Sequence, residues 1–125
     1  MGLEPANLFV RQSIEGYGGG GFRVSGRRWQ GSVIVFPGQT ITWPVSMIAD
    51  LSIEDFSPLI DSRESIEIIL LGCGPRIGYV DLATCAKLRE HGTVIEPMDT
   101  GAACRTFGVL SEQGRRVTAA LIAVE

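Results

Sequence analysis

The amino-acid sequence predicts a single α/β domain, and three observations lead to this prediction. From residue 66 onward, segments typical of strands and helices alternate in the order strand, helix, strand, helix, strand. Such alternation is typical of parallel strands joined by right-handed helical crossovers. Residues 22–43 instead contain short strand-like runs separated by turns, which indicates an antiparallel β portion. The chain has 125 residues, 45% of them hydrophobic, which is enough to build one core.

The N-terminal residues 1–21 are expected to be a flexible lead-in, and residues 22–125 to form the domain. The lead-in ends in four consecutive glycines, 18–21, which cost much conformational entropy to order. A glycine-rich phosphate-binding loop is the alternative, but it needs a preceding strand and a following helix. Here Phe22 and Val24 alternate with polar residues as in a strand, so a flexible connection is expected.

The region 22–64 is predicted to be mainly antiparallel strands followed by one short helix. Residues 32–36 form an apolar, β-branched run typical of a buried strand. Residues 28–31 and the Pro37-Gly38 pair have turn character, and residues 39–43 resume an extended pattern. Ser57-Pro58 is a good N-cap and first-turn pair, which predicts a helix over about 58–63.

The C-terminal half gives the clearest predictions. The run 66–71 is typical of a central parallel strand, because it is apolar on both faces. Asp81 is a candidate N-cap, and Asp99 or Thr100 is a candidate cap for a second helix. Gly92 and Gly114 would end the two helices, while Pro97 would end the strand between them. The predicted elements after the first strand are a helix over 82–90, a strand over 93–96, a helix to about 113 and a strand over 117–124.

Composition excludes several function classes. The net charge of −3 and the absence of a basic cluster argue against a nucleic-acid binder. The sparse cysteines Cys73, Cys85 and Cys104 are expected to be reduced thiols in a cytoplasmic protein. No apolar run approaches the roughly 20 residues that span a bilayer, so no transmembrane segment is expected. The first residues lack the basic and apolar regions of a signal peptide, and they are too poor in arginine for a transit peptide.

Candidate ligand-binding residues follow two strands of the predicted sheet. Ligands of open α/β sheets favour the carboxyl ends of strands, where the loops 72–76 and 96–101 fall. Glycines there allow close backbone approach, and a helix N-terminus and an arginine would attract a small anion. In the simpler alternative, the glycines only permit a turn and the aspartate only caps a helix. The candidate set is Gly72, Cys73, Gly74, Arg76, Asp99, Thr100, Cys104 and Arg105.

Catalytic and metal chemistry find less support in the sequence. Cys73 could be a nucleophile, but His91 lies at the far end of the following helix, roughly 15 Å away at the helical rise per residue. We expect His91 to interact with the helix C-terminus instead. No spacing typical of metal ligands occurs, so neither a metal nor a cofactor is expected. The sequence leaves open whether the chain is an enzyme, although the missing catalytic set favours a non-enzymatic role.

Several motifs resemble one known family. Residues 97–107, then Val109-Leu110, then 114–121 resemble the signature of the NADH:ubiquinone oxidoreductase complex assembly factor 3 family, which belongs to a wider group of unknown function in bacteria, archaea and mitochondria. Residues 72–74 and 29–35 are also similar, and the resemblance covers about residues 13–124. It implies a three-layer α/β fold with a mixed central sheet plus an antiparallel β portion. It also implies respiratory assembly proteins as partners, and no established enzymatic activity.

Three functional hypotheses follow. The first is a non-enzymatic interaction or accessory protein that assists assembly of respiratory complex I. The second is a small-anion binding module built from the two strand-end loops. The third is a thiol enzyme that uses Cys73.

Overall fold

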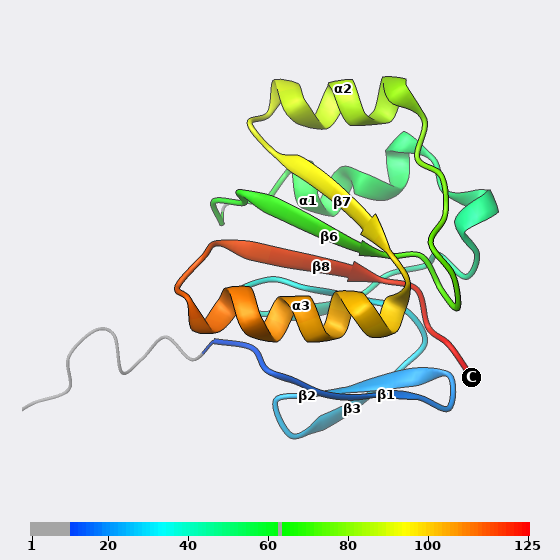
Figure 1. The fold of residues 1–125 in the computed structure, drawn as a ribbon, viewed down its shortest axis with the longest axis vertical. Helices are drawn as coiled ribbons and strands as arrows, with labels where there is room; N and C mark the ends of the chain where they lie inside the picture. The colour runs from blue at the N-terminus through cyan, green and yellow to red at the C-terminus, as the bar shows by residue number, and fades with distance from the viewer. Residues whose placement is uncertain (1–10, 63) are drawn as a thin grey trace, which may run out of the picture.

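The computed structural model describes residues 11–62 and 64–125, and this part of the chain contains two β-sheets (Figure 1). The smaller sheet is antiparallel, with strand order β1-β2-β3. The larger sheet is mixed, with order β5-β4-β8-β6-β7, in which β6 runs parallel to β7 and β8. The strands are β1 Ile14–Gly18, β2 Gly21–Val24, β3 Arg27–Gln30, β4 Val33–Val35, β5 Thr40–Thr42, β6 Ile68–Gly72, β7 Val94–Met98 and β8 Val117–Leu121.

Helices cover both faces of the larger sheet, which confirms the predicted three-layer architecture. Three short helical segments between β5 and β6 lie on one side with α2, Leu82–Glu90, and α3, Thr100–Glu112, lies with the smaller sheet on the other (Figure 1). The alternation of β6 explains this, because Ile69 and Leu71 belong to one core and Leu70 belongs to the other. The helical segments are η2 Ile48–Asp50, η3 Ile53–Phe56, α1 Ser57–Ile60, α2 Leu82–Glu90 and α3 Thr100–Glu112.

The expected boundary after residue 21 does not coincide with an edge of the fold. Residues 14–18 form β1, which pairs with β2, whereas residues 1–10 of the expected lead-in lie outside the described residues. The glycines make the tight turn between these strands, with positive φ at Gly18, Gly19 and Gly20. The guanidinium of Arg28 donates hydrogen bonds to the carbonyls of Gly18 and Gly19, at 3.2 and 3.0 Å. These two bonds connect the turn to β3.

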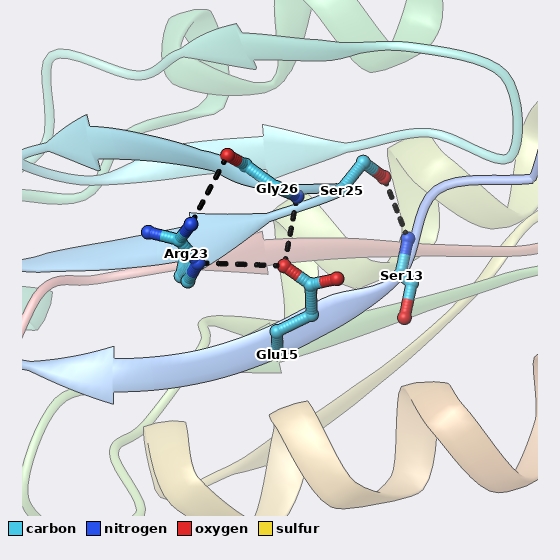
Figure 2. Close-up of polar contacts among 5 residues, drawn as sticks. All are labelled: Ser13, Glu15, Arg23, Ser25 and Gly26. Atoms are coloured by element: carbon cyan, nitrogen blue, oxygen red, sulfur yellow. Dashed lines mark hydrogen bonds and ion pairs between the residues drawn. The ribbon is translucent and has the colours of Figure 1, made fainter.

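Polar contacts hold the other end of the smaller sheet together (Figure 2). The carboxylate of Glu15 accepts a hydrogen bond from the backbone N–H of Gly26 at 2.8 Å and lies 3.8 Å from the Arg23 guanidinium. The Ser25 hydroxyl accepts a hydrogen bond from the backbone of Ser13 at 3.0 Å. These bonds connect β1 and the residue before it to the β2–β3 turn.

Some local predictions were wrong. Residues 28–31 were expected to form a turn, but Arg27–Gln30 is strand β3, and only Gly31 adopts a turn conformation, with φ of 84°. Pro97 was expected to end its strand, but it lies within β7 opposite Leu71. β7 is an edge strand. The Val94 N–H and the Met98 carbonyl bond toward β6, and backbone groups alternate in direction along a strand. The nitrogen of Pro97 therefore faces the open edge. Proline is tolerated there because no sheet bond is lost.

Candidate functional site

The predicted neighbourhood of the two strand-end loops is confirmed. Because β6 and β7 are parallel and adjacent, Gly72 lies opposite Met98, and the backbone N–H of Cys73 donates to the Met98 carbonyl at 2.8 Å. The loop after β6 and the start of α3 therefore meet at one rim of the larger sheet. We call the group Gly72, Cys73, Gly74, Asp99 and Thr100 the strand-end rim.

Thr100 fills the centre of the strand-end rim. Its side chain is fully buried, and its hydroxyl donates to the Ile122 carbonyl at 2.7 Å and accepts from the Gly74 N–H at 2.9 Å. The Thr100 N–H in turn donates to the Gly74 carbonyl at 2.8 Å. A Cβ atom on Gly72 would stand 3.0 Å from the Thr100 Cα and 2.9 Å from a Leu121 methyl, so only glycine fits. The rim is thus a close junction of three chain segments.

Three backbone N–H groups at the N-terminus of α3 are hydrogen-bonded within the protein. Asp99 caps the helix, because its carboxylate accepts from the Ala102 N–H at 2.8 Å. The Ala103 N–H donates to the Asp99 carbonyl, and the Thr100 N–H is bonded to Gly74 as described above. Binding of a small anion by the strand-end rim stays a prediction, and an anion at these three donors would have to displace their bonds.

The two candidate arginines lie in different settings. Arg76 is exposed in the loop between β6 and α2. Arg105 extends from α3 toward the smaller sheet, where its guanidinium donates to the Tyr17 hydroxyl at 3.2 Å. Arg105, Cys104 and Tyr17 border a hollow of about 290 Å³ between α3 and β1. Arg105 therefore serves the contact between helix and hairpin, whereas Arg76 faces solvent.

Burial keeps the candidate thiols protonated. Cys73 is 3% exposed, and its Sγ donates to the Leu71 carbonyl at 3.7 Å. Burial is the main factor that raises the pKa of Cys73, and it outweighs the hydrogen bonds from the Gly78 and Met98 backbone. Burial likewise raises the pKa of Cys104 to about 12. A buried, protonated thiol is a poor nucleophile, so the geometry favours structural roles for both cysteines.

This burial predicts slow alkylation of the folded protein. At neutral pH, a pKa of about 12 leaves Cys104 with on the order of a thousandfold less thiolate than a free cysteine. We therefore expect iodoacetamide to label Cys104 and Cys73 far more slowly than it labels the free thiol of glutathione. The half-buried Cys85 should be the first of the three cysteines to be labelled. Mass spectrometry of quenched samples gives each rate, and the same chain in urea is the control. Labelling of Cys73 faster than glutathione would revive the thiol-enzyme hypothesis.

In residues 11–62 and 64–125, no group of three or more histidine, cysteine, aspartate or glutamate side chains is arranged to hold a metal ion. None of the helices in these residues combines the length and apolar character needed to cross a bilayer.

The sequence reasoning missed a groove between η2–η3 and the start of α2. Two adjoining hollows of about 380 and 430 Å³ share Leu51, Asp81 and Thr84 in their linings. We call these hollows together the α2 groove. Large apolar residues at 77, 79 and 82, between a buried strand and a helix, were the available signal. Their spacing fits neither a strand nor a helix, so periodicity did not identify them.

Comparisons with known proteins agree on the family and on the fold. Residues 14–122 match a family model described as a protein of unknown function, DUF498/DUF598. NADH dehydrogenase [ubiquinone] 1 alpha subcomplex assembly factor 3 is 34% identical in Bos taurus and 32% identical in Homo sapiens, each over 87% of this chain. The chain spans 59% of the length of these two relatives. An uncharacterized protein of Rhodobacter capsulatus is 30% identical over 87% of this chain and 82% of its own length.

Solved structures share the whole architecture. A Bartonella henselae structure, reported as an outer membrane protein, has a TM-score of 0.85 and 34% identity, with 92% of this chain and 97% of that chain covered. A Bordetella pertussis structure reported as an Mth938-like domain has a TM-score of 0.77 and 27% identity, with 98% and 90% covered. The arrangement of the two sheets is therefore shared with experimentally solved relatives.

Proposed function

The chain belongs to the DUF498/DUF598 family of proteins of unknown function, and from its similarity to named assembly factors we propose that it is a non-enzymatic accessory protein that assists assembly of respiratory complex I. The observation that carries the proposal is the 32–34% identity to those relatives across 87% of this chain. Under this proposal the chain binds other proteins of the assembly process. It acts in the cytoplasm, where its three free cysteines stay reduced.

The strand-end rim supports a non-enzymatic role on physical grounds. An active site needs an accessible reactive group beside a cavity for substrate. Thr100 occupies the middle of the rim, and burial keeps the Cys73 thiol protonated. The centre of the candidate site therefore serves packing, which favours a function carried by the molecular surface.

Deletion of the gene in its native host tests the proposal. We expect severalfold less assembled NADH dehydrogenase on native gels, accumulation of partly assembled enzyme, and rescue by the wild-type chain. A Cys73→Ala chain should rescue equally well, because the proposed function does not use the thiol. Normal assembly in the deletion strain would contradict the proposal, and rescue by wild type but not by a stably folded Cys73→Ala chain would favour the thiol enzyme.

A further inference from the structure

Two stretches of the chain line the α2 groove. One is η2 with η3, and the other is the end of the loop before α2, residues 79–81, with the first turns of α2. The loop is pressed against η2, since a Cβ atom on Gly78 would stand 2.6 Å from a side-chain carbon of Ile48. Val80 anchors the loop in the core on that side of the sheet. The groove is therefore preformed by packing rather than by a loosely held loop.

Large apolar side chains stand exposed around this groove. Met47, Ile77, Tyr79 and Leu82 have exposed fractions of 60%, 68%, 76% and 79%. These are the four highest fractions among the large apolar residues of the described ranges, and all four lie on the segments that form the groove or immediately beside them. A concentration of exposed apolar residues of this kind marks an interaction surface, whereas single scattered residues would not.

Negative charge predominates on the same segments. Asp81 lines both hollows, and its pKa is lowered by the hydrogen bond from the Thr84 backbone, so it is ionised at neutral pH. Asp50 lies between two groove-lining residues on η2, and Glu54 adjoins the groove-lining Ile53 on η3; both side chains are exposed. Lys87 is the basic residue in the groove lining. A partner would therefore meet exposed apolar side chains among mainly acidic charged groups.

We propose that the α2 groove binds an amphipathic helix of a partner protein, which inserts apolar side chains into the two hollows and places lysine or arginine side chains against Asp50, Glu54 and Asp81. This inference rests on the proposed function and names the chemistry of its partner. An extended peptide would need an open sheet edge for main-chain pairing, but none of the residues that line the groove belongs to a strand. A helix needs only side-chain contacts, which the hollows provide.

A pair of synthetic helices tests this inference with the full chain. Both peptides have about 18 residues, long enough to be helical, and carry leucines along one face. One carries lysines beside the leucines, and its twin carries glutamates. We expect the lysine peptide to shift the amide resonances of residues 47–54 and 77–87 and to bind about tenfold more tightly than its twin, with the difference shrinking in high salt.

Substitutions at and beside the α2 groove separate the apolar and charged contributions to peptide binding. Leu82→Ala should weaken binding of the lysine peptide by about tenfold, because it removes an exposed apolar side chain beside the groove-lining Asp81 and Ala83. Asp50→Lys should weaken the lysine peptide and strengthen its glutamate twin. Val109→Ala, at an exposed position on α3, is the matched control and should leave both affinities unchanged.

Several outcomes would overturn the inference. These are equal binding of the two peptides, resonance shifts outside the groove, or unaltered affinity in Leu82→Ala. A concentration-dependent dimer that Leu82→Ala dissociates would assign the groove to a second copy of this chain instead. Groove-specific peptide binding combined with normal NADH dehydrogenase in the deletion strain would leave the inference standing and remove the proposed function.

Discussion

Thr100→Val is expected to lower the free energy of unfolding by about 3 kcal/mol, because it leaves two buried backbone groups without partners. The Thr100 hydroxyl bonds to the carbonyl of Ile122 and the N–H of Gly74, and the residue is fully buried. Valine has nearly the same shape, so the loss is one of hydrogen bonding rather than of packing. Urea denaturation followed by circular dichroism measures the change.

Thr100→Ser is the matched control for this prediction. Serine keeps the hydroxyl and loses one buried methyl group, which should cost about 1 kcal/mol. If the valine variant proved as stable as the serine variant, the hydrogen bonds of Thr100 would not be what holds the strand-end rim together. The comparison also bears on function, since an anion site at this rim would have to open the same bonds.

The sequence predicted best those elements whose ends carry their own local signals. Residues 82–90 were expected to be helical and are α2, because Asp81 caps the helix through the Thr84 N–H at 2.7 Å. The second long helix was also expected, and Asp99 caps it in the same way. A carboxylate at an N-cap satisfies nearby backbone donors wherever the helix packs, so this signal does not depend on the rest of the fold.

The errors fall where distant contacts decide the structure. Four glycines in a row indicate flexibility by themselves, yet Arg28 clamps their carbonyls from a strand later in the chain. Pro97 usually ends a strand, but it is accommodated because β7 lies at the edge of the sheet. Neither the clamp nor the strand order is encoded in the local pattern, so local reading could not have found them.

In the candidate site, too, one part could be predicted from the sequence and another part depended on distant contacts. The parallel order of β6 and β7 made it predictable that the loops after them would be neighbours. Whether that rim was open depended on the Thr100 side chain, which turns inward and bonds to Gly74 and Ile122. The α2 groove depends on how a loop packs against η2, and no periodic pattern reports such a contact. The sequence therefore located a rim correctly and gave no means of telling whether it was open.

Phe107→Ala is expected to have the largest effect on stability, a loss of about 4 kcal/mol. Phe107 is 1% exposed and belongs to the core that includes Phe22 of the smaller sheet and Leu70 of the larger one. Truncation would open a cavity where α3 joins both sheets. Since domains of this size typically have a free energy of unfolding of about 5–15 kcal/mol, the variant would lose a large part of its stability. Val109→Ala, 54% exposed on the same helix, should change stability by less than about 0.5 kcal/mol.

The same variant tests whether the two sheets unfold together. Trp29 packs in the core shared by the smaller sheet and α3, whereas Trp43 lies in the core on the opposite face of the larger sheet. Chains that keep only one tryptophan, with phenylalanine at the other position, report on the two cores separately. If α3 couples the sheets, both fluorescence signals should show one urea midpoint, shifted equally by Phe107→Ala. A change of the urea midpoint confined to the Trp29 signal would mean that the smaller sheet unfolds independently. The strand-end rim and the α2 groove would then depend on the larger sheet alone.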